Sequence, residues 1–409
     1  MSDVNLDVNP LLAGIRVLDL SRLLPGPYCS LYLAQMGAEV IKIEDPDGGD
    51  YARQVPELFA QVNRGKRSIT LDLRQIDDVS IFKRLVATAD VVLESFRPGV
   101  MDQFGCGYES LKQINPRLVY AALTGYGQTG PYRDRAGHDI NYLAVAGVLD
   151  QIGVQGGGPA QANVPFADLT GAMNCTIGIL AAVIGARASG VGAMVDVSIT
   201  DASAALNVIA LASLRQRGGS EARGQDLLSG ALPNYAIYKC RDGRHLAIGA
   251  LEPKFLKRLL QGLALTLPAP LQRLLGKAKP KPPADRNHAA RGMGDTERMH
   301  DIGRLRRQLR PLRALLTVLL RLRRRDDWVC LLADQDACVT PVLSLEEALR
   351  NEQLRARHMV VDDAGRPSFN LPIHFSNAQA RQAASPELGA DAMDILAELN
   401  DRTRPAQTA

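Results

Sequence analysis

The sequence predicts an α/β protein built on a parallel β-sheet. Short apolar runs, typical of buried strands, alternate with helical segments, and several of these runs end in polar turns. The first two runs, residues 14–20 and 38–44, flank one helix that begins at Pro25-Gly26-Pro27 and ends before Gly37. A strand, helix, strand unit of this kind joins parallel strands, so we expect them to lie in one sheet.

The remaining elements follow in order along the chain. Further strands are predicted at residues 69–73, 90–94, 118–124 and 195–198, and helices at 172–188 and 202–214. A polar, Gly-rich stretch at 218–230 reads as a linker that closes a large domain at 11–217. Beyond it, Asp242-Gly243 between two apolar runs predicts a β-hairpin, and Glu252 followed by Pro253 is expected to start a helix.

Composition is that of an ordinary globular protein. Hydrophobic residues make up 46% and charged residues 22% of the 409 residues, and we find no uninterrupted apolar run of the length of a membrane span. Residues 1–10 have no signal-peptide character, so we expect a cytoplasmic protein. The six cysteines are scattered without a CxxC pair, which predicts reduced thiols and no metal site.

The segment 271–325 is strongly basic. It holds sixteen Lys and Arg against four acidic residues, whereas the whole chain has a net charge of only +4. Such a segment is typical of nucleic-acid or acidic membrane contacts, but a solvated insert is the interpretation we favour, with no nucleic-acid and no membrane partner. A stretch translated out of frame and then restored would give the same composition.

Two polar motifs stand out as candidate sites. Gly137-His138-Asp139-Ile140-Asn141 places an imidazole and a carboxylate at the start of an apolar helix. An imidazole there would exchange protons readily, although a capping or core histidine is the structural alternative. Four cations, Arg64, Lys66, Arg67 and Arg74, flank the short strand at 69–73, which suits a polyphosphate or a solvated basic loop equally well.

These motifs, in their order and spacing, resemble those of the class III CoA transferase family, and within it the α-methylacyl-CoA racemase branch. The resemblance spans nearly the whole chain, and we identified it from the segments 25–27, 63–68, 96–100, 125–130, 137–142, 168, 249–253 and 336–342. It implies an interlocked homodimer and a large Rossmann-like domain with a parallel sheet. It also implies a smaller α/β domain, placed at 231–335, and a C-terminal part, 336–400, that returns to the large domain.

The resemblance further implies an acyl-CoA substrate bound on the large domain, with CoA entering as part of the substrate and no separate cofactor. The implied CoA-binding residues lie in three groups: Leu71, Asp72, Leu73 and Arg74; Glu94, Ser95, Phe96 and Arg97; and Gly137, Asp139, Ile140, Asn141 and Tyr142. Two positions at which racemases tend to carry arginine are Asp45 and Gln103 in this chain. A weakened phosphate clamp could then borrow Lys66 and Arg67.

The implied catalytic residues are His138, Asp168 and Glu252. Inverting a carbon next to a thioester takes two acid/base groups on opposite faces, which His138 and Asp168 would supply, with Glu252 orienting the imidazole. The helix start near Asp168 would offer backbone N–H groups to the enolate oxygen. As structural alternatives, Asp168 and Glu252 would only cap their helices, and Asp139 would be a local cap.

Three functions remain open at this point. The first is racemisation of a 2-methyl-branched acyl-CoA in lipid metabolism. The second is CoA transfer between an acyl-CoA and a carboxylic acid, with Asp168 as covalent nucleophile. The third is a non-catalytic relative that binds CoA. Transferases commonly carry a run of glycines that is missing near Glu252 in this chain. They also do not usually have a histidine at the position of His138. Both observations favour the racemase.

Overall fold

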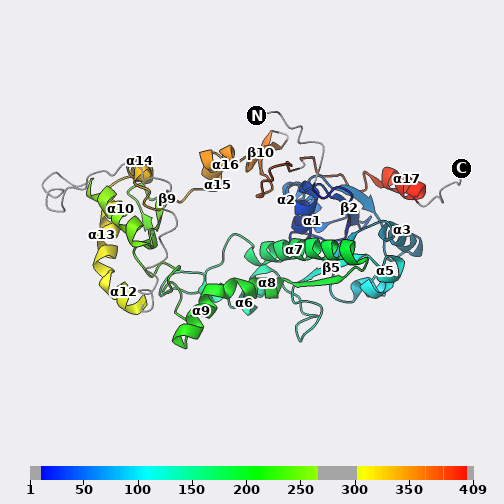
Figure 1. The fold of residues 1–409 in the computed structure, drawn as a ribbon, viewed down its shortest axis with the longest axis horizontal. Coiled ribbons are helices and arrows are strands. Elements are labelled where there is room, and N and C mark those ends of the chain that lie inside the picture. Colours follow the sequence, from blue (N-terminus) through cyan, green and yellow to red (C-terminus); the bar gives the residue numbers. More distant parts are fainter. Residues whose placement is uncertain (1–10, 266–301, 364, 381, 403–409) are drawn as a thin grey trace. The chain divides into compact units, whose positions relative to one another are not determined.

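The computed structural model describes residues 11–265, 302–363, 365–380 and 382–402. The chain folds as two units, whose elements are labelled in Figure 1. Of the described residues, those in 11–149, 161–208 and 349–402 form the first unit, and those in 150–160, 209–265 and 302–348 form the second.

The first unit is built on a six-stranded sheet in the order β3-β2-β1-β4-β5-β6, with every neighbouring pair parallel. Its strands are β1 (Arg16–Asp19), β2 (Glu39–Glu44), β3 (Arg67–Thr70), β4 (Val91–Glu94), β5 (Val119–Thr124) and β6 (Met194–Ser198). This is the strand order of a doubly wound Rossmann fold, so the predicted fold class is confirmed. Strand β3 begins two residues earlier than expected, because Arg67 and Ser68 already pair with β2.

Helices cover both faces of this sheet and connect its strands. Those of the first unit are α1 (Pro25–Gln35), α2 (Pro56–Asn63), α3 (Ile76–Val86), α4 (Val100–Gln103), α5 (Tyr108–Ile114), α6 (Asp139–Val145), α7 (Phe166–Ser189), α8 (Ile199–Ala204), α16 (Glu352–Ala356) and α17 (Ala392–Arg402). Short 3-10 turns lie at Tyr51–Gln54, Leu149–Gln151 and Ala205–Asn207, and a hairpin is formed by β10 (Val360–Asp363) and β11 (Arg366–Phe369).

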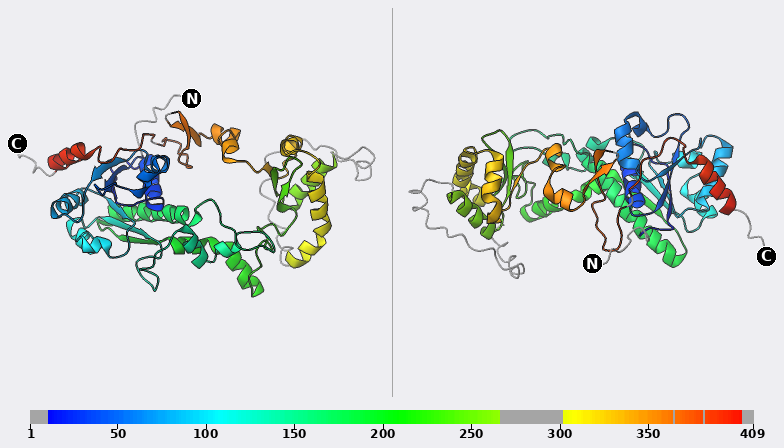
Figure 2. Two further views of the ribbon diagram at one scale, coloured as in Figure 1. Left: turned by 180° about the vertical axis from the view of Figure 1, so that it is seen from behind. Right: turned by 90° about the horizontal axis from the view of Figure 1, so that it is seen from above.

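Alternate residues of the strands fill two apolar cores, one on each face of the sheet. Val17, Val40 and Val91 pack with α1 and α7 on one face. Leu18, Ile41 and Val92 pack with α3, α5 and α17 on the other. The result is a three-layer arrangement, in which α7 and α3 can be followed on their separate faces (Figures 1 and 2). A near-continuous apolar strand buried on both faces is what a parallel sheet requires.

Helix α7 is 24 residues long and, by length and composition, apolar enough to cross a membrane. It was not recognised in the sequence as a single apolar run. Its residues Ala172, Cys175 and Ile179 are buried in the core against β5 and β6, however, which is the setting of a core helix of an α/β domain.

The second unit contains an antiparallel sheet in the order β7-β8-β9, formed by β7 (Tyr235–Lys239), β8 (His245–Gly249) and β9 (Val339–Pro341). The predicted β-hairpin is confirmed by the pairing of β7 with β8. Its helices are α9 (Val208–Arg217), α10 (Pro253–Ala264), α12 (Ile302–Gln308), α13 (Arg310–Leu320), α14 (Arg325–Leu332) and α15 (Leu345–Ala348), with a 3-10 turn at Ala333–Gln335. Helices α10, α13 and α14 cover the sheet around the buried side chain of Trp328.

Part of the basic segment is integral to this second unit. Residues 271–301 lie outside the described residues, but α13 buries Leu316 and Leu320 in the core. The Nη2 of Arg313 donates to the carbonyl oxygens of Gly230 and Ala231, at 2.5 and 3.0 Å. For residues 310–320 the expectation of a solvated insert is therefore wrong, because Leu316 and Leu320 form a buried helical face.

The boundaries of the two units differ from the domain boundaries expected from the sequence. Residues 336–348 belong to the second unit because β9 pairs with β8, and the chain returns to the first unit only from Leu349. The loop 150–160 also belongs to the second unit, where Arg223 donates to the carbonyl oxygens of Asp150 and Gly157 at 2.5 and 2.7 Å.

Candidate active site

The His138 segment lies at the carboxyl edge of the sheet, in the connection that leaves β5. His138 has an extended backbone and is the N-cap residue of α6. The side-chain oxygen of Asn141 accepts the backbone N–H of His138 at 3.0 Å, which fixes the turn into the helix. The imidazole itself is exposed to solvent. Ligands of open α/β sheets bind at this edge, so the position of His138 suits a site.

Two glycines make room for the ring of Tyr142, which anchors this segment. A Cβ atom at Gly137 would lie 2.7 Å from Tyr142 Cε1, and one at Gly125 would lie 2.5 Å from the same atom. The Tyr142 hydroxyl donates to the carbonyl oxygen of Gly137 at 2.5 Å. The glycine before His138 is therefore needed for close packing, and Tyr142 holds the start of α6 against β5. Tyr142 is buried and Ile140 lies at the surface.

Asp139 joins the starts of α6 and α7. Its Oδ1 accepts the backbone N–H groups of Ala167 and Asp168, at 2.7 and 3.2 Å. Asp139 was expected to be a local cap, but it caps a helix that begins 27 residues further along the chain, at Phe166. A carboxylate at this place also offsets the positive end of the α7 dipole. One residue thereby brings His138 and Asp168 to the same place.

Asp168 is not a capping residue, because α7 begins earlier than predicted. The helix starts at Phe166 with Pro165 as N-cap, so Asp168 is the third helical residue. Within the described part of the chain, its carboxylate accepts no hydrogen bond and forms no ion pair. Burial, and next the charge of Asp139, raise the pKa of Asp168 to about 6. Burial and the charge of Asp168 raise the pKa of Tyr142 to about 12.

The start of α7 offers no N–H group to an enolate oxygen. Asp139 occupies those of Ala167 and Asp168, the N–H of Phe166 donates to the Val164 carbonyl, and that of Leu169 to the Pro165 carbonyl. The expectation of an oxyanion site here is wrong, since the donors that a helix start normally leaves open are already bonded.

The first group of implied CoA-binding residues follows β3. Leu71 is buried, and Leu73 is a partly buried neighbour of the same core. The guanidinium of Arg74 pairs with Asp72 at 2.6 Å and with Asp45 at 3.3 Å. The aspartate found where racemases tend to have arginine thus neutralises the nearest cation. With 60% of its side chain exposed, Arg74 could still exchange these partners for a phosphate.

The second group follows β4 and has a mixed character. Glu94 is buried, and burial raises its pKa to about 8 although its Oε2 accepts the Phe96 N–H at 2.7 Å. This carboxyl group, at the end of β4, is therefore mainly protonated at neutral pH. Ser95 Oγ accepts the backbone N–H of Arg22 at 3.1 Å. Arg97 is exposed, and its side chain forms no hydrogen bond or ion pair with any described residue.

Sequence reasoning missed Arg22, which lies beside this second group. Its guanidinium carbon is 5.0 Å from the centre of the Phe96 ring and 5.1 Å from that of Tyr51. The one available signal was its position just after β1, at the same edge of the sheet. Arg22 and Arg97 are therefore the cations at this edge that are best placed to meet phosphate groups.

Lys66 and Arg67 are not open to a phosphate clamp. Lys66 is fully buried, where its Nζ lies 3.1 Å from Asp19, 3.0 Å from the Pro27 carbonyl and 2.8 Å from Asn63. Arg67 pairs with Glu39 at 2.8 Å and with Glu398 at 2.9 Å. The suggestion that the clamp borrows these cations is wrong, because each already neutralises a carboxylate.

Glu252 belongs to the second unit. It is the N-cap residue of α10, with Pro253 at the first helical position, but its side chain makes no capping hydrogen bond. It is exposed, and its charge contributes to raising the pKa of Cys338, although burial is the main cause. Cys338 in turn lines a cavity of about 800 Å³ within the second unit, together with Ile237, Ala247 and Ile248.

Comparisons with known proteins agree with this architecture. The sequence profile described as CoA-transferase family III matches residues 12–392. Alpha-methylacyl-CoA racemase of Mus musculus is 35% identical over 391 residues, which are 95% of this chain and 93% of that protein. Succinate--glutarate CoA-transferase of Agrobacterium fabrum is 32% identical over 97% of this chain and 98% of its own length.

A solved structure supports the same assignment. The crystal structure of a CAIB/BAIF family protein from Brucella suis superposes with a TM-score of 0.78 at 30% identity, covering 96% of this chain and all of that chain. A profile match over nearly the whole length, together with relatives of this identity and coverage, confirms the resemblance seen in the sequence: the chain belongs to CoA-transferase family III.

Proposed function

We propose that this family member is an acyl-CoA racemase that inverts the carbon next to the thioester of a 2-methyl-branched acyl-CoA. The observation that carries the proposal is the state of Asp168. It is a half-buried carboxyl group that has no hydrogen-bond or ion-pair partner among the described residues and a pKa of about 6, and Asp139 brings it to the start of the helix that His138 caps. A residue with this pKa can be both proton acceptor and proton donor near neutral pH.

The proposed reaction is a two-base proton exchange. One of the pair, His138 or Asp168, removes the α-proton, and the electron pair left on carbon is delocalised into the thioester carbonyl as an enolate. The other residue, in its protonated form, delivers a proton to the opposite face. The enzyme returns to its starting charge once the two residues have exchanged roles, so either enantiomer can be the substrate.

We assign Glu252 a positioning role in this reaction. An exposed carboxylate that does not cap its own helix is free to hydrogen-bond an imidazole, and such a partner fixes the orientation and tautomer of a histidine. Glu252 belongs to the second unit and His138 to the first, so its assignment rests on the sequence pattern that it shares with racemases.

The experiment that tests the proposal is α-proton exchange in deuterated water. Each enantiomer of a 2-methylacyl-CoA is incubated with the protein, and deuterium at the α-carbon is measured together with configuration. Racemisation predicts label and loss of configuration from both enantiomers. The H138A variant should lose exchange from one enantiomer and D168N from the other, while H374A, which removes an exposed histidine elsewhere in the first unit, should retain both. Full exchange in H138A would contradict the assignment.

CoA transfer is the second candidate function, favoured by the transferases among the relatives. In that reaction the Asp168 carboxylate attacks the thioester carbonyl, CoA leaves as a thiolate, and the thiolate then attacks the resulting anhydride at Asp168 to form an enzyme thioester and a free acid. Incubation with an acyl-CoA and a second acid distinguishes the two. CoA appearing on the added acid, with a thioester on Asp168 detected by mass spectrometry and no α-deuterium, would establish transfer instead.

A non-catalytic CoA-binding relative remains the third possibility that the same experiment addresses. It predicts neither exchange nor transfer, with binding of CoA retained. Because Arg22 and Arg97 are two of the cations at the carboxyl edge, an R22M/R97M variant should weaken CoA binding in all three cases. Binding measured by equilibrium dialysis therefore separates loss of CoA affinity from loss of chemistry.

A further inference from the structure

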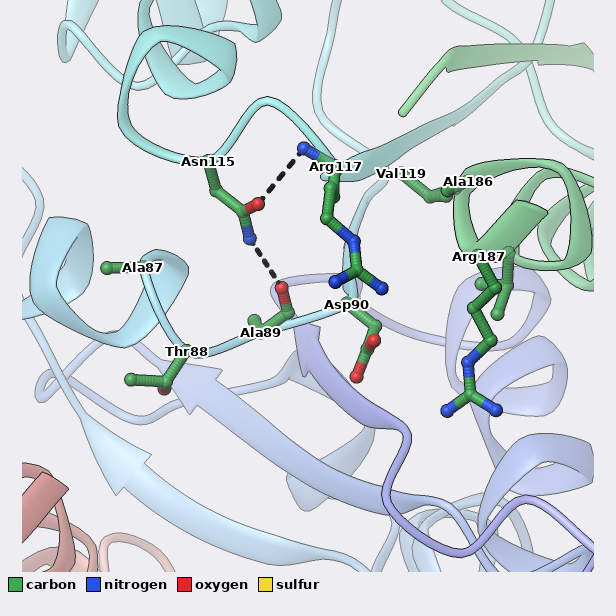
Figure 3. A pocket seen from close by; sticks show the side chains of 10 residues that line it. Ala87, Thr88, Ala89, Asp90, Asn115, Arg117, Val119, Ala186 and Arg187 are labelled. Carbon is green, nitrogen blue, oxygen red and sulfur yellow. Dashed lines mark hydrogen bonds between the residues drawn. The ribbon is translucent and has the colours of Figure 1, made fainter. Parts of the chain in front are cut away.

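A second pocket lies at the opposite, amino-terminal edge of the same sheet. It has a volume of about 330 Å³ and lies within the first unit. Its walls are the α3–β4 loop at residues 87–90, the α5–β5 loop at 115–117, and the last turns of α7 at 183–187 (Figure 3). We call this the amino-edge pocket. The candidate active site is at the carboxyl edge, so this pocket is not part of it.

The walls of the amino-edge pocket are held in place by hydrogen bonds. The Asn115 side-chain nitrogen donates to the carbonyl oxygens of Ala89 and Val86, at 2.7 and 3.1 Å. Its oxygen accepts the backbone N–H of Arg117 at 3.1 Å (Figure 3). One side chain thus clasps the two loops together, which fixes the backbone from which Arg117 extends.

Three charged side chains line the pocket, and they have few hydrogen-bond or ion-pair partners among the described residues. Arg117 and Arg187 are exposed, and neither side chain forms a hydrogen bond or ion pair with the residues that the structure describes. Figure 3 shows Arg117 and Arg187 extending from separate walls, with Asp90 between them in this view. Asp90 accepts the backbone N–H of Arg16 at 2.9 Å through one oxygen and retains further acceptor capacity.

A role in stability accounts for only part of this arrangement. Arg187 lies in the last turn of α7, where a cation stabilises the negative end of the helix dipole. Arg117 has no comparable role. Arg16, another cation near these loops, is already neutralised by Glu39 at 2.8 Å and by Glu398 at 3.4 Å.

Charge and donor geometry indicate the class of ligand. Two guanidinium groups and one carboxylate give the pocket a net charge of +1, which complements a monoanion better than a dianion or a zwitterion. A guanidinium fork matches the two oxygens of a carboxylate, and the Asp90 carboxylate can accept a hydrogen bond from a donor on the ligand. We propose that the amino-edge pocket binds a small hydroxycarboxylate, with its carboxylate between Arg117 and Arg187 and its hydroxyl group on Asp90.

Arginine labelling with 4-hydroxyphenylglyoxal tests this proposal without relying on catalysis. The labelling rate of each arginine in the whole protein is followed by mass spectrometry at constant ionic strength. Lactate, propionate and alanine are three of the probes, because they share a carbon skeleton and differ in a hydroxyl group, a hydrogen and an ammonium group. Inorganic phosphate is the fourth. Arg310, which is exposed in the second unit, is the internal control.

The expected result is that lactate slows labelling of Arg117 and Arg187 together, severalfold more than propionate or alanine does, and leaves Arg310 unchanged. An R117M variant should lose the protection of Arg187 by lactate, whereas R310M should keep it. Absence of protection by lactate, or equal protection of Arg310, would overturn the site. Equal protection by propionate would overturn the role of Asp90, and stronger protection by inorganic phosphate would overturn the ligand class.

Discussion

The carboxyl group of Asp168 stays protonated to a higher pH than that of an ordinary aspartate. Burial is the main cause and the charge of Asp139 the second, and together they raise its pKa from 3.8 to about 6. Between these two pH values the folded protein binds more protons at this site than the unfolded chain does. Stability that is fully present below the lower value is therefore lost as the pH rises through the higher one.

We predict that D168N stabilises the fold while abolishing racemisation. Well above pH 6 the substitution eliminates a buried, unpaired charge, and the free energy of unfolding should rise by on the order of 2 kcal/mol after allowance for partial exposure. Below the ordinary pKa of aspartate the gain should vanish, because both proteins are then uncharged at this position. Urea denaturation at the two pH extremes measures the difference.

The matched control for this prediction is D201N, at an exposed aspartate in the first turn of α8. It should leave stability nearly unchanged at both pH values. A D168N protein that is no more stable than the wild type at neutral pH would show that the Asp168 carboxylate is adequately solvated, and its assignment as a poised acid/base group would then lose its main support.

Gly137 is predicted to be intolerant of any side chain. A methyl group there would clash with the Tyr142 ring, 2.7 Å away, and would displace the residue next to His138. We expect G137A to cost about 1–3 kcal/mol of stability, as overpacking usually does, and to lower the exchange rate further than this loss explains. Gly185 within α7 has no atom within 4 Å of a built Cβ, so G185A should be neutral or slightly stabilising.

Thermal unfolding and exchange kinetics of the two glycine variants test this prediction. If G137A melts with the wild type and keeps its exchange rate, Tyr142 has room to move. The packing of Gly137 against Tyr142 would then not determine the position of His138.

At the scale of elements, Asp139 couples the capping of α7 to the acidity of Asp168. We predict that D139N and D139A separate these effects. Asparagine keeps an oxygen for the N–H groups of Ala167 and Asp168 but carries no charge, so the pKa of Asp168 should fall with little loss of stability. Alanine removes the cap as well and should cost about 1 kcal/mol.

The pH dependence of α-proton exchange reads out this coupling. For the enantiomer whose proton Asp168 removes, the wild-type rate should decline as the pH falls through about 6, where the carboxylate becomes protonated. In D139N the decline should begin at a lower pH. An unchanged profile in D139N would mean that Asp139 does not set the acidity of the catalytic carboxyl group.

Elements defined by local patterns could be predicted from the sequence. Apolar runs, proline at helix starts and Asp242-Gly243 gave the strands, α1 and the hairpin to within a few residues. Helix α7 was predicted six residues too late because its cap, Asp139, lies far back in the chain. Lys66 was predicted to be available to a phosphate for the same reason, because its partner Asp19 is 47 residues away in the sequence. Interactions between distant residues leave no local signal.

At the scale of the whole molecule, α7 presents an apolar surface that the first unit does not cover. Ile177 and Ile184 are 65% and 70% exposed, and Met173 is 41% exposed. Ile177 and Ile184 are two helical turns apart, so they lie on one face of the helix, with Met173 one turn earlier. Exposed apolar surface of this kind usually marks an interface. We propose that a second copy of the chain covers it, as expected for a homodimer.

The I177E/I184E variant tests this homodimer. Placing two carboxylates in an apolar interface costs their hydration, so the variant should shift from dimer toward monomer by sedimentation velocity while the wild type remains dimeric. I76E is the control, because Ile76 is 80% exposed at the start of α3, where an acidic residue is favourable. A wild type that sediments as a monomer, or a variant that remains fully dimeric, would place the interface elsewhere or remove it.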